Sequence, residues 1–150
     1  GDERMAGVIA NSGMPCCIMH NRKEAVYQNF ILDVLADLKE SLELAKNAGI
    51  HQDKIILDPG IGFAKSYEQN LLLLQQIEVL NSLGYPVLLG TSRKSVIGIT
   101  LDLPVEQRIN GTVATTVMGV MKGCSFVRVH DIKENVQAIK MTEAILQAGK

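Results

Sequence analysis

The sequence lacks an excess of charge of either sign: 15 lysines and arginines stand against 16 aspartates and glutamates. A near-neutral chain without a basic stripe is not typical of generic nucleic-acid binding, so we expect no nucleic-acid partner. Any site for an anionic ligand must therefore be local, formed by a few residues rather than by the surface as a whole.

Long apolar runs are missing too. The stretch Ile77–Leu83 is interrupted by three polar residues and is far shorter than the ~20 residues that a membrane span needs. Gly1–Asn11 has no basic start followed by an apolar stretch, which is the pattern of a signal peptide. We expect a soluble protein without a membrane partner. Its 150 residues, 47% of them hydrophobic, suit one domain over residues 1–150 with a packed core.

Cysteine is scarce. Cys16, Cys17 and Cys124 are odd in number and two of them are adjacent, which fits neither a disulfide framework nor the C-x-x-C spacing of metal sites. We expect all three to be small core residues of a protein in the reducing cytoplasm. GxSxG, GxGxxG and Walker motifs are absent, as is any His/Cys/Asp cluster with the spacing of a protein-only metal site.

The stretch Ile55–Lys65 (IILDPGIGFAK) is the centre of what the sequence does contain. Its first three residues predict a strand buried on both faces, which ends in Asp58 and opens into a glycine-bearing turn. A carboxylate there lies at the rim of a sheet, where a ligand can reach it, although Asp before Pro also begins ordinary turns. Three more predicted strands follow the same plan, with polar groups at their C-terminal ends: Pro15–His20, Pro86–Lys94 and Ser125–His130.

Helices alternate with these strands. Ser66 with Gln69 and Asp131 with Glu134 match capping boxes, and a stripe of Ile109, Val113 and Val117 predicts the buried face of another helix. The predicted helices lie within Gly1–Ser12 and over about Asn29–Ala48, Ser66–Leu83, Val105–Lys122 and Asp131–Ala148.

Strands that alternate with crossover helices require a parallel sheet, and right-handed crossovers place all the C-terminal strand ends on one rim. Asp58, Lys94, Arg128 and His130 are therefore expected to gather there. Open α/β sheets and (β/α)8 barrels both carry their sites at this rim. His20 and His51 are weaker candidates, and we expect His51 at the surface.

The cations at this rim suggest the chemistry of a ligand. Arg93 and Lys94 precede a predicted helical turn, where each opposes the helix dipole by about 0.3–1 kcal/mol, so they favour an arriving anion or polar ligand over a merely solvated basic turn. Alternation in the last strand places Arg128 and His130 on one face. An arginine in a buried strand needs a partner, and its fork suits a carboxylate or a phosphate, either in a ligand or in a structural ion pair.

Three motifs in this order closely resemble the C-terminal half of the dihydropteroate synthase family: LDPGIGFAK (57–65), GTSRKSVIG (90–98) and RVHD (128–131). The resemblance covers essentially the whole chain, including Met19-His20, and departs from the commoner GFGK only at Ala64. It implies an α/β fold of the (β/α)8 TIM-barrel type. This chain would supply only the C-terminal half of the barrel, about four parallel strands with flanking helices.

The resemblance also implies an activity, the condensation of 6-hydroxymethyl-7,8-dihydropterin pyrophosphate with 4-aminobenzoate to dihydropteroate and pyrophosphate in folate biosynthesis. It implies Mg²⁺ as the cofactor, with ligands outside this chain and none within it. Lys94, Arg128 and His130 would be the catalytic residues. The implied binding residues are Asp58, Met19, Gly90 and Lys94 for the pterin, Phe63, Arg93 and Ser95 for 4-aminobenzoate, and Arg128 and His130 for the pyrophosphate.

A complete barrel of this kind needs about 250 residues. We therefore expect a half-barrel with two unpaired strand edges, which associates with another copy as a homo-oligomer such as a homodimer, or with a missing half. Turnover by the chain alone should be weak or absent. Three alternatives stay open: a methyltransferase-type barrel that binds methyltetrahydrofolate, a Schiff-base lyase that uses Lys94 as nucleophile, and a non-catalytic pterin-binding half-barrel.

Overall fold

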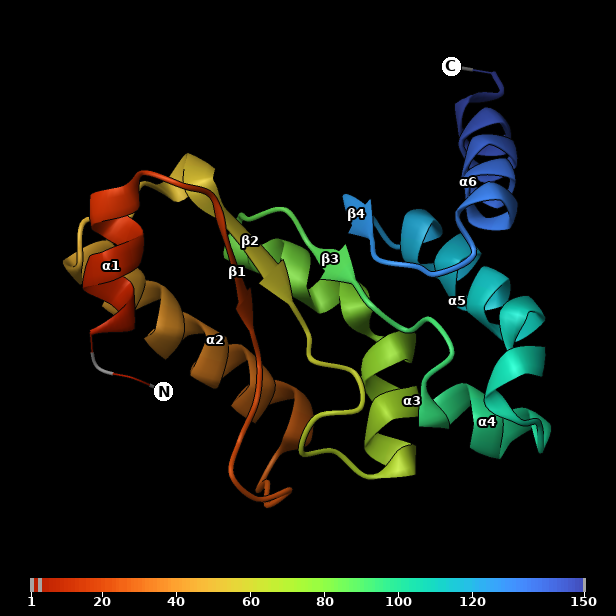
Figure 1. Ribbon diagram of the computed structural model, residues 1–150, viewed down its shortest axis with the longest axis horizontal. Helices are drawn as coiled ribbons and strands as arrows, with labels where there is room; N and C mark the ends of the chain where they lie inside the picture. Colours follow the sequence, from red (N-terminus) through yellow and green to blue (C-terminus); the bar gives the residue numbers. More distant parts are fainter. Residues whose placement is uncertain (1, 3, 150) are drawn as a thin grey trace.

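The computed structural model describes residues 2 and 4–149, which form four parallel strands that alternate with helices. The strands lie in chain order across the middle of the molecule (Figure 1). Leu57 forms an isolated parallel bridge with Val87, which connects the two pairs of strands. The predicted alternation and parallel pairing are confirmed. The strands are β1 (Cys16–Met19), β2 (Ile55–Asp58), β3 (Leu88–Leu89) and β4 (Phe126–Val127).

The helices form where local sequence signals predict them. Asn29 accepts a hydrogen bond from the Leu32 amide at the start of the second helix, and Gly49 follows that helix with a left-handed φ of 87°. Ser66 and Gln69 form the predicted capping box of the third helix. The helices are α1 (Met5–Ser12), α2 (Phe30–Asn47), α3 (Tyr67–Gln75), α4 (Ser95–Leu101), α5 (Ile109–Met121) and α6 (Ile132–Gln147), with 3-10 turns at Gln52–Lys54, Ile77–Leu83 and Val105–Gln107.

The core lies between the strands and the helices that cover one of their faces. Val34 and Leu38 of α2, Leu73 of α3, and Leu57 and Leu89 of the strands are each 1% exposed or less. Each such side chain contributes roughly 1.5–3 kcal/mol through burial. The packing of α2 and α3 against the strands therefore fixes where the carboxyl ends of β2 and β3 lie.

The opposite face of the strands is open. Paired residues of parallel neighbours point the same way, and the registers pair Cys17 with Ile56 and Leu88 with Phe126. These residues are exposed or half-buried, whereas their neighbours along each strand are more buried. Two sequence-based predictions are therefore wrong: β2 is buried on one face only, and Cys17 is exposed rather than a core residue.

Several predicted boundaries also change. The strands predicted over Pro86–Lys94 and Ser125–His130 are reduced to two residues each, because β4 pairs with β3 alone among the described residues. The helix predicted over Ser66–Leu83 tightens into a 3-10 turn after Gln76, whose φ and ψ are −116° and 23°. The predicted helical turn after Lys94 is the full helix α4.

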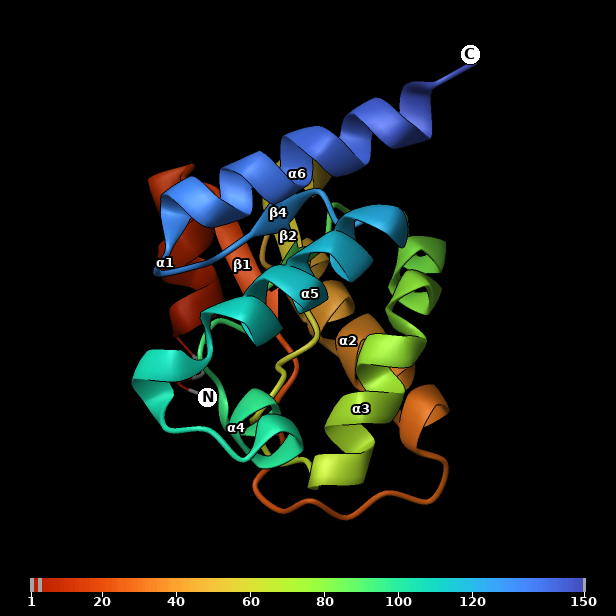
Figure 2. The ribbon, with the colours of Figure 1, turned by 90° about the vertical axis from the view of Figure 1, so that its right-hand side faces the viewer.

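The fifth helix buries a different face from the one predicted. It begins at Ile109 rather than at Val105, and its buried residues are Thr112, Thr116 and Gly119 instead of the valine stripe. These small residues let α6 and the neighbouring strand approach closely, and Figure 2 shows α6 running beside α5. No helix of the described part of the chain is long and apolar enough to cross a membrane.

Candidate functional site

The candidate site lies at the carboxyl ends of the strands. Asp58 is the last residue of β2 and pairs in register with Met19, the last residue of β1. Gly90 follows β3, and a Cβ there would lie 3.9 Å from Asp58 Oδ2. The structure thus brings together three of the four residues assigned to the pterin. Gly90 is buried and leaves room beside the carboxylate that a side chain would fill.

The Asp58 side chain is half-buried in a polar environment. Its Oδ1 accepts a hydrogen bond of 2.7 Å from the Gly60 amide in the turn that follows. Burial raises the pKa of the Asp58 carboxyl, while the Gly60 amide and the nearby charges of Lys94, Lys65 and Arg128 oppose this rise. No group of the described residues donates a hydrogen bond to the second carboxylate oxygen, Oδ2, so an N–H donor of a ligand would bind well at this partly desolvated place.

Lys94 is directed towards the same turn. Its Nζ donates a hydrogen bond to the Ile61 carbonyl and lies 4.9 Å from the centre of the Phe63 ring. Burial lowers the pKa of the Lys94 ammonium, and Asp58 opposes this effect. A Cβ on Gly62 would lie 3.5 Å from Lys94 Cδ, so the lysine chain passes close to the turn. Lys94 therefore lies beside the Phe63 ring, which is 42% exposed.

Arg128 and His130 follow β4 on the open side. Both are exposed, which corrects the expectation that the arginine lies in a buried strand. The reason is that β4 ends at Val127, so Arg128 extends beyond the sheet, with its amide donating to the Leu89 carbonyl at 2.9 Å. His130 Nδ1 lies 2.8 Å from Ser92 Oγ, which also accepts the His130 amide hydrogen at 3.1 Å.

Arg93 is held differently from the prediction. Its guanidinium binds both carboxylate oxygens of Asp131, at 2.6 and 3.1 Å, so the positive charge of Arg93 is paired with the carboxylate of Asp131. The predicted capping box of α6 is therefore wrong, because the Asp131 side chain is turned towards Arg93 and makes no cap hydrogen bond. Ser95, the third residue assigned to 4-aminobenzoate, is exposed at the start of α4.

Sequence reasoning assigned no role to two residues of this region: His20, which it gave only as a weaker candidate, and Lys65. His20 is only 2% exposed, and Lys65 Nζ lies 2.9 Å from its Nδ1. Both belong to quoted motifs, Met19-His20 and LDPGIGFAK, which was the available signal. Their contact joins residues 45 positions apart, and no local pattern predicts it. His51, by contrast, is exposed as expected.

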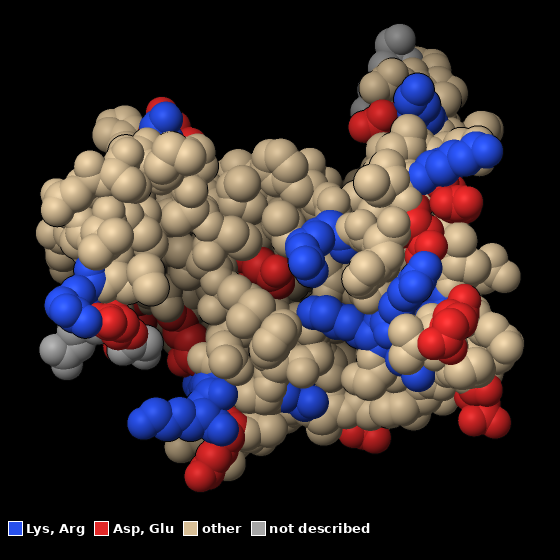
Figure 3. All heavy atoms as spheres, in the orientation of Figure 1, with Lys and Arg blue, Asp and Glu red and all other residues tan. Residues whose placement is uncertain are grey.

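Charges gather where these elements meet. In the space-filling view, basic and acidic side chains lie close together near the middle of the molecule, over β2 to β4, and the surface to their left is largely uncharged (Figure 3). Asp58, Lys94 and Arg128 lie around the same strand ends. Lys94 donates to the Ile61 carbonyl in the turn after Asp58, and the Arg128 amide donates to the carbonyl of Leu89, which precedes the Gly90 that lies beside Asp58 Oδ2. The predicted gathering of these three side chains at one rim is therefore observed.

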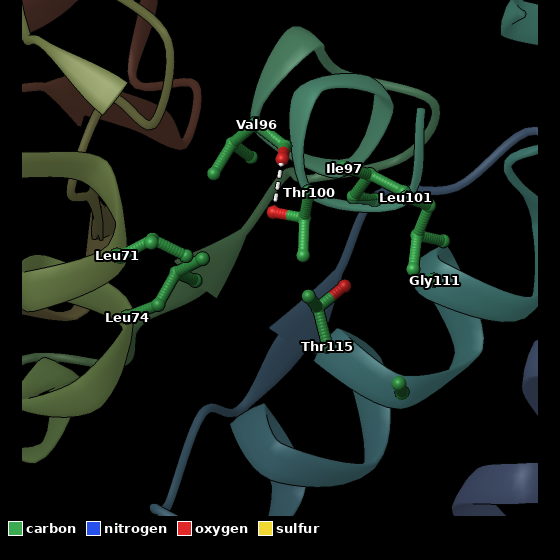
Figure 4. Close-up of a pocket in the computed structure, with 9 residues that line it drawn as sticks. Leu71, Leu74, Val96, Ile97, Thr100, Leu101, Gly111 and Thr115 are labelled. Carbon is green, nitrogen blue, oxygen red and sulfur yellow. Dashed lines mark hydrogen bonds between the residues drawn. The ribbon is translucent and has the colours of Figure 1, made fainter. Parts of the chain in front are cut away.

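A cavity of about 190 Å³ between α3, α4 and α5 is not this site (Figure 4). Its lining is almost entirely apolar, with Leu71 and Leu74 on one side and Ile97 on the other. The Thr100 hydroxyl in its wall donates to the Val96 carbonyl at 2.7 Å. None of the predicted site residues lines it, so we interpret it as a packing gap within the helix layer.

A parallel β/α unit with a carboxylate, a lysine and an arginine at the carboxyl ends of its strands has the organisation of a TIM-barrel enzyme. The chain belongs to the pterin-binding enzyme family, whose pattern matches residues 1–130. The fold is accordingly of the TIM-barrel type, with the chain covering part of the barrel. The TIM-barrel type of fold that the sequence resemblance implied is thereby confirmed.

Curated relatives carry the name dihydropteroate synthase. The protein of Clostridium beijerinckii is 58% identical over 147 residues, which cover 97% of this chain and 55% of that protein. The protein of Bacillus subtilis is 50% identical, covering 99% of this chain and 52% of that protein. This chain therefore spans about half the length of the curated relatives that it matches.

Solved structures show the same relationship. The dihydropteroate synthase of Clostridium difficile, determined in the presence of pteroic acid, superposes with a TM-score of 0.93 at 46% identity, covering 95% of this chain and 55% of that one. The Yersinia pestis enzyme with a pterin–sulfa conjugate superposes with a TM-score of 0.91 at 37% identity, covering 95% and 56%.

Proposed function

We propose that this chain forms the C-terminal half of a dihydropteroate synthase, a transferase of folate biosynthesis. The enzyme would condense 6-hydroxymethyl-7,8-dihydropterin pyrophosphate with 4-aminobenzoate. The observation that carries the proposal is that Asp58, Lys94 and Arg128 are held around the same strand ends and the turn that follows Asp58. The similar structures determined in the presence of pteroic acid and with a pterin–sulfa conjugate support the same substrate class.

The pterin would bind beside Asp58. The free carboxylate oxygen accepts hydrogen bonds from the ring N–H groups, and Lys94 donates to the carbonyl side of the ring. Met19, which is 37% exposed, and Gly90 border the flat heterocycle. Phe63, Arg93 and Ser95 would border the 4-aminobenzoate, with Arg93 acting through its backbone and side-chain stem, because Asp131 already holds its guanidinium.

The chemical step needs stabilisation of the leaving pyrophosphate. Arg128 and His130 are exposed on the open side, where they would bind the charge that develops as the C–O bond breaks. Donors that meet this charge lower the barrier because the charge on the leaving oxygen is larger in the transition state than in the bound substrate. The neutral aryl amine then needs mainly positioning to attack the electron-deficient carbon.

The same proposal includes Mg²⁺ with the pyrophosphate, held by residues outside this chain. Among residues 2 and 4–149, no group of three or more His, Cys, Asp or Glu side chains is arranged to hold a metal ion. A cytoplasmic location is likewise proposed, and the three free cysteines support it.

We further propose that the open side is covered by a second half-barrel. Within the described residues, β1 pairs only with β2, and β4 only with β3. Met19 and Phe126 leave 37% and 47% of their surface exposed on this side. Strand edges and apolar residues of this kind favour a partner that continues the sheet. An N-terminal half-barrel would do so, and self-association into a homo-oligomer is the competing outcome.

A binding and turnover experiment tests the proposal. The chain is combined with residues of the Clostridium beijerinckii relative that precede the matched region, and both binding of the pterin pyrophosphate and release of pyrophosphate in the presence of 4-aminobenzoate are measured. We expect Asp58→Asn to weaken pterin binding by about ten- to hundredfold, the loss of a charged hydrogen bond. The exposed Asp53→Asn is the matched control.

Three results would contradict the proposal. Pterin binding without pyrophosphate release would favour a non-catalytic binding module. Methyl transfer from methyltetrahydrofolate would favour the methyltransferase alternative. Trapping of a carbonyl substrate on Lys94 by borohydride would favour the Schiff-base lyase.

A further inference from the structure

The ammonium group of Lys65 is surrounded by acceptors that link two parts of the chain. Its Nζ lies 2.9 Å from the Gly60 carbonyl, 2.9 Å from the Phe63 carbonyl and 2.9 Å from His20 Nδ1. An ammonium has three N–H donors, so each proton has one acceptor. This lysine is thus bonded to both ends of the turn that follows Asp58 and to the residue that follows β1.

The far side of His20 is fixed as well. Its Nε2 lies 3.0 Å from Asp37 Oδ2 of α2, and Arg22 binds both oxygens of that carboxylate at 2.6 and 3.0 Å. Because the lysine only donates, His20 Nδ1 must accept, and the ring proton is on Nε2 and is donated to Asp37. Burial lowers the pKa of the His20 ring, with a further lowering by Lys65, which agrees with a neutral imidazole.

The turn Gly60–Phe63 provides backbone groups that bind the side chains of the candidate site. The Gly60 amide binds Asp58 Oδ1 at 2.7 Å, and the Ile61 carbonyl accepts from Lys94. The Phe63 amide binds the Gly60 carbonyl at 3.1 Å. A displacement of this turn would therefore move the partner of the carboxylate, the acceptor of the lysine and the exposed phenyl ring together.

We propose that Lys65 is a positioning residue, which holds the turn Gly60–Phe63, and with it Asp58 and Phe63, in the geometry of the site by binding the turn to His20. The inference deepens the proposed function and rests on it for the ligand. In this role Lys65 acts through its contacts with Gly60, Phe63 and His20 rather than through contact with a substrate. Its contribution is to keep the turn in one arrangement, so that binding does not have to order it.

The first test needs no ligand. We measure ring ¹⁵N shifts of His20 by NMR and hydrogen exchange of the Gly60, Gly62 and Phe63 amides in the whole chain. The wild type should show the Nε2–H tautomer at neutral pH, and Lys65→Met should speed exchange of the three amides by about tenfold or more. The exposed Lys39→Met of α2 is the control and should change neither.

Two variants of His20 separate positioning from simple packing. The amide oxygen of His20→Asn reaches about as far as Nδ1 and can still accept from Lys65. His20→Gln places its amide near the Nε2 position, where it can still bind Asp37 but not Lys65. We expect His20→Gln to speed exchange of the turn amides like Lys65→Met, and His20→Asn to stay near the wild type. A role in packing alone would make both variants equally harmful.

The second test measures affinity for the pterin pyrophosphate in the chain combined with the N-terminal residues of the relative. Lys65→Met and His20→Gln should weaken binding by about tenfold, and His20→Asn by less than about threefold. An Nδ1–H or doubly protonated His20, or unchanged turn exchange in Lys65→Met, overturns the inference without any ligand. If the exchange results hold and the wild type binds no pterin, the proposed function fails and the structural role of Lys65 stands.

Discussion

The guanidinium of Arg93 and the carboxylate of Asp131 form a bidentate salt bridge, with Nη2–Oδ1 and Nε–Oδ2 distances of 2.6 and 3.1 Å. The pair joins the loop before α4 to the start of α6, two segments 38 positions apart. Arg93 has a left-handed φ of 59°, and its amide is bonded to Thr112 Oγ1 at 3.1 Å. The pair therefore ties the loop that carries Lys94 to the last helix.

This pair predicts a pH-dependent stability. The guanidinium of Arg93 lowers the pKa of the Asp131 carboxyl. A carboxyl with a lowered folded pKa adds stability above its unfolded pKa, and that stability is lost as the pH falls through the folded value. We expect Asp131→Asn to lower the free energy of unfolding at about pH 7 and to have a shrinking effect below about pH 4. Urea denaturation over this pH range measures the difference.

Glu143→Gln is the matched control, because it removes one carboxylate from an exposed position of the same helix. It should change the free energy of unfolding little at any pH in the series. A wild-type advantage over Asp131→Asn that stays constant down to about pH 3 would show that the carboxylate charge does not stabilise the fold.

Gly60 occupies a position that only glycine fits. Its φ is 69°, and a Cβ there would overlap the backbone carbonyl of His20. The left-handed conformation costs a side chain about 1–2 kcal/mol, and forced displacement of a buried backbone adds about 1–3 kcal/mol. We expect Gly60→Ala to lower the free energy of unfolding by about 2–5 kcal/mol, measured by urea denaturation.

Gly84→Ala separates the two causes. Gly84 has a φ of 78°, and a Cβ there meets nothing within 4 Å. Only the conformational cost of about 1–2 kcal/mol should appear. Equal losses in the two variants would mean that the turn moves away from His20 without cost, and would also weaken the case for a fixed turn.

The sequence predicted best what depends on neighbouring residues. The capping box of Ser66 and Gln69 was found, because it involves groups within a few positions of one another. The strand Ile55–Asp58 was found because its apolar run ends at a proline–glycine turn. The predicted rim followed from parallel connectivity, which the alternation of strands and helices imposes.

Predictions that depend on distant residues were less accurate. Asp131 has a partner for a capping box at Glu134, but its carboxylate binds Arg93 instead. The valine pattern of α5 gave the wrong buried face, because Thr116 pairs with a buried asparagine of α6 that no local pattern reveals. Arg128 was expected in a buried strand, whereas β4 ends at Val127 and Arg128 is exposed on the open side of the sheet.

A buried polar contact between α5 and α6 gives a third prediction. The Thr116 hydroxyl donates to Asn135 Oδ1 at 2.7 Å, and Asn135 Nδ2 donates to the Asp131 carbonyl at 2.8 Å. Both side chains are 1% exposed or less. Asn135→Ala leaves the buried Thr116 hydroxyl without this partner and removes one of the two hydrogen bonds that the Asp131 carbonyl accepts, so we expect a loss of about 1–3 kcal/mol in the free energy of unfolding.

Thermal or urea unfolding of a double-mutant cycle checks this contact. Thr116→Val removes the hydroxyl, so the double variant Thr116→Val/Asn135→Ala should lose less stability than the sum of the single variants. Asn110→Ala, an exposed position of α5, should cost little. Strict additivity would contradict a coupling between the two side chains.

Arg108 holds the loop after α4 and packs where Gly98 has no side chain. Its Nε donates to the Leu103 carbonyl and its Nη1 to the Arg93 carbonyl, each at 3.0 Å. A Cβ on Gly98 would overlap the Arg108 guanidinium. We expect Gly98→Ala to displace this side chain and to lower the free energy of unfolding by about 1–3 kcal/mol, the cost of the two lost hydrogen bonds.

A double variant tests whether displacement of Arg108 is the cause of the stability lost in Gly98→Ala. In an Arg108→Ala background the guanidinium is gone, so Gly98→Ala should cost almost nothing and can even stabilise α4 by up to about 1 kcal/mol through helix propensity. Gly111→Ala is the control, because its Cβ would overlap the Ile97 side chain and not Arg108. Its cost should be the same in both backgrounds. If Gly98→Ala costs as much without Arg108 as with it, the loop is held by contacts other than this guanidinium.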